Sequence, residues 1–312
     1  MPYTSSFEGQ DVPVSPGSTS YFSQPSAGLD PMLFTGKHLR PWVRNGITRM
    51  LFDHLAVQYM NPNRWVSVWL AGSGVSYQWE SAREPGDLDC LVGINYVVFR
   101  QLNSDYAGLS NSEIAGMLNE SFYKDLMPET ANWEGYELTY YVNPASDIRD
   151  INPYAAYDLI SDSWTVEPDP KASPPHNRAW EERAKKDNDT ATQLIKAYSQ
   201  ALTDYRGSAA NAALKINAEA RLKTAIDRAA DFYEDLHHGR SAAFSSTGAG
   251  YSDFNNYRWQ SGKQSGIVQA LRMLKIYRDQ AKKSEEVNTY GVELPSADVL
   301  IRRALTYRGV RQ

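Results

Sequence analysis

The chain has 312 residues, of which 42% are hydrophobic and 12% aromatic, and its formal net charge is −5 at pH 7. This composition supplies enough apolar surface for a packed core and excludes wholesale disorder. No apolar run approaches the ~20 residues that a membrane-spanning helix needs, and the N-terminus lacks the basic and apolar regions of a signal peptide. With a single cysteine, Cys90, there is no intrachain disulfide, and we expect a cytoplasmic protein.

Charge is distributed unevenly along the chain. Residues 1–175 contain 10 Lys and Arg against 21 Asp and Glu, whereas residues 176–312 contain 22 against 16. An acidic part followed by a basic part predicts two modules with different partners. The basic part is weakly indicative of a polyanionic partner.

The first elements follow a tail. Residues 1–30 are rich in Ser, Pro and Gly, and we interpret them as a flexible N-terminal tail or as a peptide draped over the domain. A helix is predicted from Pro41, with an apolar stripe that runs to Met60 and includes Trp42 and His54. "RWVSVWLAG" then predicts a short strand.

Two more strands and a helix follow. "DLDCLVGINYVVF" is interpreted as the second strand, with a turn at Gly93 as an option, and "YELTYYVNP" as the third. Between them, residues 109–127 predict a helix that begins at Ser110 or Ser112. The Pro- and Asp-rich region 145–175 is interpreted as a crossover leading into a linker.

The remainder is mainly helical. Apolar spacing predicts an antiparallel hairpin of helices over 177–206 and 209–238, then helices over 266–283 and 296–308, with a Gly/Ser/Asn-rich segment of unclear structure before them. We therefore predict an α+β fold in which a small mixed sheet with flanking helices occupies residues 31–175. A mainly α-helical domain is expected over residues 176–312.

Asp87 and Asp89 are the strongest candidates for chemistry. Strand alternation places both on one face, with Leu88 and Cys90 on the other. Two adjacent carboxylates in a water-poor site repel each other unless a cation joins them, and Mg²⁺ takes one or two carboxylates together with substrate phosphates. Cys90 itself is interpreted as a small buried strand residue rather than as a nucleophile.

Two further features complete this candidate site. Glu137 is the single acidic residue of its predicted strand and could supply a third carboxylate for a second metal ion, with Glu134 and Asp147 as alternatives. The Gly72-Ser73 pair follows a strand, so its backbone could approach a phosphate closely. It is neither a Walker A loop nor a nucleophile elbow.

A strand that ends in Gly72-Ser73, then a gap of 13 residues, and then the Asp-x-Asp of "PGDLDCLVGI" together resemble the DNA polymerase β-like nucleotidyltransferase superfamily. The resemblance covers roughly residues 40–145. It implies that the sheet is a nucleotidyltransferase sheet, that Asp87, Asp89 and Glu137 form the metal triad, and that Gly72 and Ser73 bind the triphosphate. An α-helical domain after the catalytic sheet is common in that superfamily. Position 137 is usually Asp there.

The function that follows from this resemblance is a Mg²⁺-dependent transfer of a nucleoside monophosphate from a nucleoside triphosphate, such as ATP, to an acceptor hydroxyl. Two Mg²⁺ ions are implied, for which Mn²⁺ could substitute. The acceptor could be an RNA or tRNA 3′ end, a protein, a small molecule or a second nucleotide. No membrane partner is expected, and the sequence leaves the oligomeric state open.

Other charged and aromatic residues could contact the nucleotide. Arg83, Arg240, Arg258 and Lys263 are candidates for binding phosphates, with solvated loop charges as the alternative. The aromatic residues of 251–259 could stack a base or pack against the sheet domain. His237 and His238 are interpreted as belonging to a helix C-terminus before Gly239 rather than as ligands.

Two competing functions stay open at this point. The first is a catalytically silent nucleotidyltransferase fold that serves as a binding or assembly module. The second is a helical structural protein whose Asp-x-Asp is incidental, which would require that residues 65–94 do not form adjacent strands.

Overall fold

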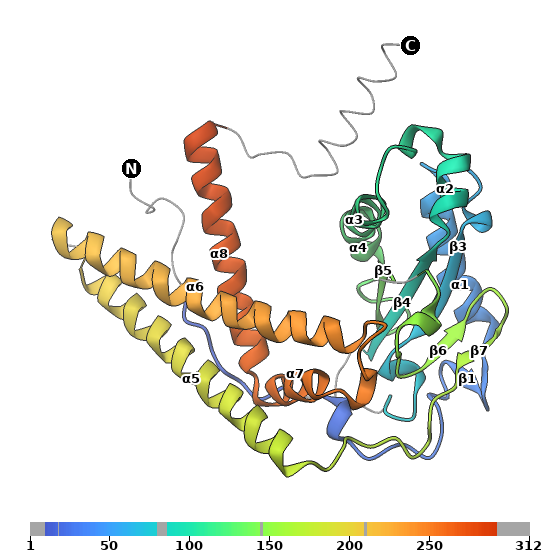
Figure 1. Cartoon of the computed structure of the whole chain (residues 1–312), viewed down its shortest axis with the longest axis horizontal. Coiled ribbons are helices and arrows are strands. Elements are labelled where there is room, and N and C mark those ends of the chain that lie inside the picture. The colour runs from blue at the N-terminus through green and yellow to red at the C-terminus, as the bar shows by residue number, and fades with distance from the viewer. Residues whose placement is uncertain (1–9, 18, 80–85, 144–145, 209–210, 292–312) are drawn as a thin grey trace. The chain divides into compact units, whose positions relative to one another are not determined.

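The computed structural model describes residues 10–17, 19–79, 86–143, 146–208 and 211–291 (Figure 1). Contacts divide the chain into two compact units. The sheet unit contains Ser20–Pro174 and Phe244–Tyr251, and the helical unit contains the residues up to Thr19, Pro175–Ala243 and the residues from Ser252 onward to Leu294. The helical unit is therefore interrupted in sequence twice, by Ser20–Pro174 and again by the eight residues Phe244–Tyr251.

A five-stranded mixed sheet forms the centre of the sheet unit, in the order β5-β4-β3-β6-β7 (Figure 1). Strands β3 and β4 are antiparallel, β4 and β5 are parallel, and β6 is antiparallel to both β3 and β7. The strands are β3 (Val66–Ala71), β4 (Gly86–Ile94), β5 (Tyr136–Val142), β6 (Ala156–Asp158) and β7 (Ser163–Val166). A separate two-stranded sheet pairs β1 (Phe34–Thr35) with β2 (His38–Leu39).

The two faces of this sheet are covered differently. On one face, alternate residues such as Leu70, Leu88 and Leu138 belong to a large apolar cluster with the buried stripe of α1 (Pro41–Ala56) and residues of α3. On the other face, a smaller cluster gathers around Trp69 and Leu91. Since alternate strand residues point to opposite faces, Asp87 and Asp89 lie on the second face.

Helices and short turns connect the strands. The α-helices are α2 (Tyr96–Leu102), α3 (Asn111–Ser121) and α4 (Met127–Thr130), with a π-helical turn, η5 (Phe122–Leu126), between the last two. The short 3₁₀ turns are η1 (Ser20–Phe22), η2 (Pro62–Arg64), η3 (Ser73–Val75), η4 (Ser104–Tyr106) and η6 (Ile148–Asp150). Ser110, rather than Ser112, caps α3 through a capping box with Glu113.

The predicted second strand is too long. It ends at Ile94, and the following "YVVF" lies in α2 in spite of its β-branched residues. The Asn95 side chain caps this helix by accepting a hydrogen bond from the Val98 N–H, and Phe99 is buried with its ring centroid 4.8 Å from that of Trp65. Capping and aromatic packing therefore override the local strand propensity.

Region 145–175 also differs from the expected crossover, because it contributes β6 and β7 to the sheet. The helix from Pro41 ends at Ala56 instead of reaching Met60. In the N-terminal segment, Tyr21 and Leu29 are buried in the sheet unit and Val12 is buried in the helical unit, as a draped peptide would be.

The helical unit consists of four helices and the N-terminal peptide, as far as the described residues go. Helices α5 (Arg178–Gly207) and α6 (Ala212–Ala243) pack along each other as a hairpin, and α8 (Ile267–Tyr290) packs on α6 (Figure 1). Helix α7 (Phe254–Ser265) lies within the segment whose structure was unclear from the sequence. The helix predicted over 296–308 lies outside the described residues.

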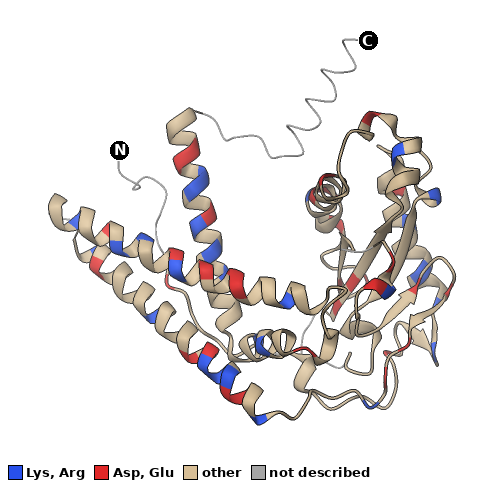
Figure 2. Cartoon of the chain, in the orientation of Figure 1, with Lys and Arg blue, Asp and Glu red and all other residues tan. Residues whose placement is uncertain are grey.

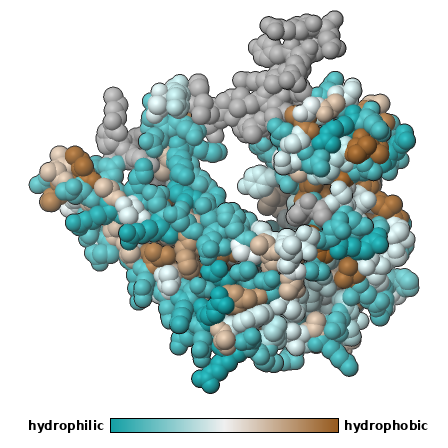
Figure 3. Space-filling view, viewed as in Figure 1, coloured by the Kyte–Doolittle hydropathy of each residue, from teal (hydrophilic) through white to brown (hydrophobic). Residues whose placement is uncertain are grey.

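An α+β fold, with a small mixed sheet and flanking helices followed by a mainly helical region, is thus confirmed. None of the helices in the described ranges is long and apolar enough to cross a membrane. On the face shown in Figure 3, apolar residues gather at the connecting end of the α5–α6 hairpin, where Leu214 and Ile216 are exposed by 58% and 68%. Two such side chains are an ordinary amount of exposed apolar surface.

Candidate functional site

The parallel pairing of β4 with β5 brings the three predicted carboxylates to one face. Asp87 pairs with Glu137, and Asp89 pairs with Thr139. Because paired residues on neighbouring strands point to the same side of a sheet, Asp87, Asp89, Glu137 and Thr139 share a face. All four side chains are half-buried. The sheet thus gathers residues that are 50 positions apart in the sequence.

The Gly72-Ser73-Gly74 turn lies directly against this face. Ala71 is the strand partner of Asp89, so the chain leaves β3 beside that carboxylate. Gly72 has a φ of 87° and ψ of −165°, and a Cβ atom at this position would lie 2.8 Å from Asp89 Oδ2. A Cβ on Gly74 would lie 2.5 Å from the carbonyl oxygen of Asp87. Only glycine fits these two positions, and the result is backbone within reach of the carboxylates.

Hydrogen bonds fix the turn and the strand face. The Ser76 hydroxyl donates to the Ser73 carbonyl oxygen over 2.8 Å, and the Ser76 N–H donates to the same oxygen over 3.1 Å. The Gly72 N–H donates to the carbonyl oxygen of Ala155 over 3.3 Å. On β5, the Thr139 hydroxyl lies 3.5 Å from Asp89 Oδ1. The turn is therefore tied to Ser76, two residues after Gly74, and to Ala155, the residue before β6.

The donor set of this face suits a hard divalent cation. Asp87 and Asp89 stand two residues apart on one strand, and the glycine turn leaves room beside Asp89 that a side chain would fill. Within the described residues, however, no three His, Cys, Asp or Glu side chains are gathered so that together they could hold a metal ion. The arrangement therefore fits an ion held by two carboxylates and completed by water and phosphate oxygens.

Cys90, next to Asp89, faces the opposite side of the sheet. It is fully buried in the large apolar cluster. Burial, reinforced by the neighbouring Asp89 carboxylate, raises the pKa of its thiol well above the usual range. A thiol that resists ionisation is a poor nucleophile, so Cys90 is a packing residue.

The alternative third carboxylates occupy other positions. Glu134 is an exposed turn residue with a φ of 51°, just before β5. The Asp147 side chain caps η6 by accepting from the Arg149 N–H and forms a 3.2 Å ion pair with the Arg149 guanidinium. Glu137 is thus the candidate that lies in register with Asp87.

Three of the four predicted phosphate-binding cations belong to a different unit from the carboxylate face. Arg83 lies outside the described residues. Arg240, Arg258 and Lys263 belong to the helical unit, and the Arg258 guanidinium is held there by Asp187 and Asp235, each at 2.9 Å. The Arg240 guanidinium carbon lies 5.4 Å from the ring centroid of Trp259. Arg258 thus has a structural role within the helical unit.

The interpretation of His237 and His238 as helix-terminal residues is wrong. Helix α6 does not end at Gly239 but continues to Ala243. A Cβ on Gly239 would lie 3.0 Å from Asn255 Oδ1, which explains glycine there by close packing rather than by a helix end. His237 stacks on Tyr233 with their ring centroids 5.8 Å apart.

Three polar residues form a group next to the turn. Gln78 and Tyr154 were not predicted as functional, whereas Tyr251 belongs to the aromatic stretch 251–259, for which base stacking or packing against the sheet domain was predicted. Gln78, Tyr154 and Tyr251 form a part-buried group, in which Gln78 Nε2 donates to the Tyr251 hydroxyl over 2.8 Å and the two tyrosine rings stack at 4.4 Å. Their positions in sequence lie up to 173 residues apart, so no local pattern could have revealed them. A glutamine four residues after a turn gives no signal by itself.

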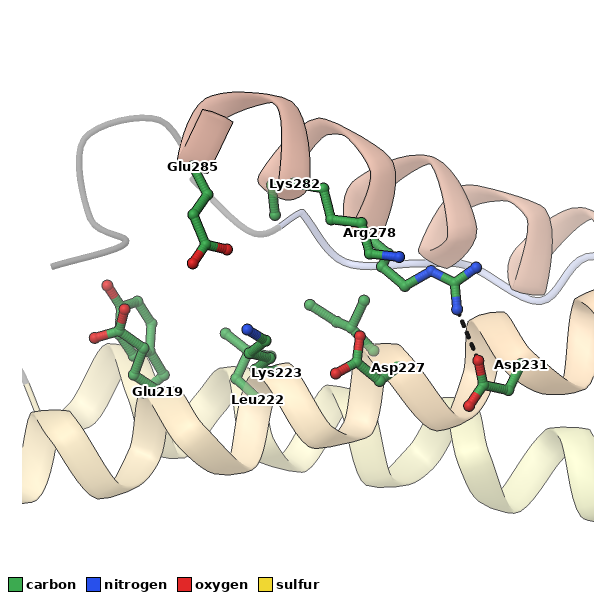
Figure 4. A pocket seen from close by; sticks show the side chains of 11 residues that line it. Glu219, Leu222, Lys223, Asp227, Asp231, Arg278, Lys282 and Glu285 are labelled. Atoms are coloured by element: carbon green, nitrogen blue, oxygen red, sulfur yellow. Dashed lines mark hydrogen bonds and ion pairs between the residues drawn. The ribbon is translucent and has the colours of Figure 1, made fainter. Parts of the chain in front are cut away.

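A groove lies in the helical unit, between α6 and α8 (Figure 4). It has a volume of about 420 Å³ and a floor that includes Leu222 and Ile226. Arg278, which is only 9% exposed, reaches across it to Asp231 at 2.7 Å and to Glu234. Charges of both signs also alternate along α5, α6 and α8 in the view of Figure 2, without a single-sign stripe. This groove is a place of internal ion pairs.

Comparisons with known proteins give no match for the chain, whether with family models, with curated proteins or with solved structures.

Proposed function

We propose that the chain is a Mg²⁺-dependent nucleotidyltransferase that transfers a nucleoside monophosphate from a nucleoside triphosphate to an acceptor hydroxyl. One observation carries the proposal: the β4–β5 register places Asp87, Asp89 and Glu137 on one face, and the Gly72–Gly74 turn packs against that face. This is the combination that the sequence resemblance implies. Acidic residues alone would also suit a structural cation, but a glycine turn beside them suits a phosphate chain.

Asp87 and Asp89 would hold Mg²⁺, which would supply positive charge next to the phosphates and so stabilise the charge that develops on the leaving group. Two carboxylates on one strand leave the remaining coordination positions to water and phosphate. Glu137, on the outer strand β5, would complete the acceptor side of the site. The ion would also relieve the repulsion between Asp87 and Asp89.

The turn would bind the β- and γ-phosphates. Glycine at positions 72 and 74 lets the backbone approach the phosphate oxygens, and Ser73 can donate its N–H and hydroxyl to them. Held in this way, the α-phosphate lies near the carboxylate face. The acceptor oxygen then forms a bond to the α-phosphorus, the bond to the bridging oxygen breaks, and pyrophosphate leaves with that electron pair while the acceptor proton is released to water.

The acceptor is proposed from the distribution of charge along the chain. The excess of basic residues after position 175 favours RNA, in particular a tRNA 3′ end, over a neutral small molecule. A protein hydroxyl is the competing acceptor. A cytoplasmic location and ATP as donor complete the proposal, and Mn²⁺ would replace Mg²⁺.

A catalytically silent relative is the second candidate, and one observation favours it. The three carboxylates are not gathered into a group that could hold a metal ion together. A chain of this kind would bind a nucleotide at the turn and use it for assembly rather than for transfer.

The test is transfer of label from each of the four α-³²P-labelled NTPs, with Mg²⁺, to bulk tRNA, to the protein itself and to a casein control. We expect transfer to one acceptor class by the wild-type chain and a loss of at least about 10³-fold in Asp89→Asn, because the carboxylates hold the ion. Equal labelling by wild type and Asp89→Asn would refute the enzyme. Mg²⁺-dependent NTP binding without transfer to any acceptor would instead support the silent relative.

A further inference from the structure

The segment Phe244–Tyr251 leaves the helical part of the sequence to join the sheet unit, and its contacts there lead to the glycine turn. Gly250 has a φ of 60°, and a Cβ on it would lie 2.2 Å from the carbonyl oxygen of Asn152. The Asn152 side chain donates to the Gly248 carbonyl oxygen over 2.5 Å. The segment is therefore docked closely onto the residues that precede β6.

Tyr251 extends this docking to the residues beneath the turn. Its hydroxyl accepts a 2.8 Å hydrogen bond from Gln78 Nε2, and its ring packs between Tyr21, at 4.7 Å, and Tyr154, at 4.4 Å. The Tyr21 hydroxyl donates to the backbone oxygen of Tyr251 over 3.0 Å. The Tyr251 hydroxyl in turn donates to the backbone oxygen of Tyr21 over 3.4 Å, so ring packing and hydrogen bonds together hold Tyr251 in one place.

A continuous chain of hydrogen bonds runs from Tyr251 to the turn. The Gln78 side chain donates to the Tyr251 hydroxyl, the Gln78 N–H donates to the Ser76 hydroxyl over 3.1 Å, and that hydroxyl donates to the Ser73 carbonyl oxygen. Ser76 is fully buried and Gln78 is 2% exposed, whereas Gly72, Ser73 and Gly74 are half-exposed above them. The conformation of the exposed turn thus depends on a buried polar support.

We propose that Gln78 and Tyr251 are positioning residues that hold the Gly72–Gly74 turn in the shape that binds the triphosphate. Tyr251 comes from the segment between α6 and α7. The affinity of the turn for triphosphate should therefore also depend on how Phe244–Tyr251 is docked onto the sheet unit. The inference rests on the proposed function, and it names residues that act through the turn rather than on the substrate.

The support is expected to work over the whole physiological pH range. Burial raises the pKa of Tyr251 to about 12, although the hydrogen bond from Gln78 opposes the shift. The Tyr251 hydroxyl therefore stays neutral and keeps accepting from the glutamine amide.

The experiment measures the Kd of the full-length chain for each NTP with Mg²⁺ by calorimetry, together with the thermal unfolding temperature. Tyr251→Phe removes the hydroxyl and keeps the ring, so we expect the Kd to rise about fivefold to tenfold. The matched control is Tyr123→Phe, which removes an exposed hydroxyl in the same unit and should leave the Kd unchanged.

A double variant separates positioning from stability. Tyr251→Phe removes one of the two acceptors of the buried Gln78 amide, which also donates to the Ala172 carbonyl oxygen over 3.3 Å, so the unfolding temperature should fall as well. Adding Gln78→Leu removes both partners, so the unfolding temperature should recover toward the wild-type value while the Kd stays raised.

Two results would overturn the inference while leaving the proposed function intact: an unchanged Kd in Tyr251→Phe, or recovery of the Kd together with the unfolding temperature in the double variant. A wild-type chain that binds none of the four NTPs would instead overturn the proposed function, and the inference with it.

Discussion

The two units use their carboxylates in different ways. In the helical unit, Asp231 and Glu234 project from α6 toward Arg278 of α8, so each negative charge is met by a guanidinium. In the sheet unit, Asp87 and Asp89 lie side by side on a strand face, next to a turn whose glycines leave backbone exposed. The first arrangement stabilises a fold, whereas the second places like charges together where a cation and phosphates would be bound.

Glycine shows the same contrast. Gly116 lies inside α3 with open space around the position of a Cβ atom. Gly72 has a positive φ, and a Cβ there would collide with Asp89. The first glycine is replaceable, while the second is required by the close approach of the turn to the carboxylates.

The largest effect on activity, after loss of Asp89, is expected at Glu137. Glu137→Gln keeps the shape of the side chain and removes its charge, so we expect the transfer rate to fall about 10²-fold if Glu137 completes the acceptor side. The control is Glu134→Gln in the preceding turn, which should leave the rate within about twofold of wild type. Equal rates for Glu137→Gln and wild type would show that Asp87 and Asp89 act alone.

Gly72→Ala should destabilise the sheet unit and weaken nucleotide binding together. An alanine would be strained at a φ of 87° and would place its Cβ 2.8 Å from Asp89 Oδ2, so we expect a loss of about 3 kcal/mol in the free energy of unfolding. Gly116→Ala, in a helix, should instead raise it by up to about 1 kcal/mol. Denaturant unfolding measures both, and equal effects of the two substitutions would contradict the close approach.

Arg278 tests whether the carboxylates of the helical unit stabilise the fold through ion pairs. Arg278→Leu keeps the apolar stem but removes the guanidinium that pairs with Asp231 and Glu234, so we expect a loss of about 2 kcal/mol. Arg206→Leu, which removes an exposed pair with Asp11, should cost less than about 0.5 kcal/mol. Both variants should bind nucleotide as the wild type does, and a nucleotide-binding defect in Arg278→Leu would mean that the α6–α8 groove is more than a place of ion pairs.

Local patterns in the sequence were sufficient for the elements that carry the candidate site. Runs of apolar, β-branched and aromatic residues predicted β3, β4 and β5, and strand alternation placed Asp87 and Asp89 on one face. The three- and four-residue spacing of apolar residues predicted the helical hairpin within a few residues. That Glu137 lies opposite Asp87 depends on strand register, which only the folded sheet fixes.

Non-local packing decided what the sequence did not show. Strand β6 has three residues, too few for a periodic signal, yet it completes the sheet beside β3. Helix α2 forms from strand-like residues because Phe99 is buried against Trp65. Tyr251 reaches Gln78 because Phe244–Tyr251 belongs to the sheet unit. Packing of residues 251–259 against the sheet domain was one of the two predictions for that stretch, but no local pattern indicates Gln78 as the partner.

The smallest expected effect concerns two histidines, one in each unit, of which His54 is half-buried and His237 is exposed. Burial lowers the pKa of His54, with Asp125 and Glu129 opposing the shift. Burial also lowers the pKa of His237, and there Arg240, His238, Lys275 and Arg272 add to the shift. Since both folded-state pKa values lie below the unfolded value of about 6.5, the unfolded chain binds more protons as the pH falls through that value. The free energy of unfolding should therefore decrease from pH 7 toward pH 5.

Changing the salt concentration distinguishes the contributions of the two histidines to the pH dependence of stability, because their charged neighbours have opposite signs. Raising the salt concentration from about 0.05 to about 0.5 M screens the cations around His237, so its share of the pH dependence should shrink. The same salt screens the carboxylates that oppose the shift at His54, so its share should grow. Comparing unfolding of His54→Gln and His237→Gln with wild type at both salt concentrations isolates each share. If both shares changed in the same direction with salt, the charges would not be arranged around the two histidines as the structure has them.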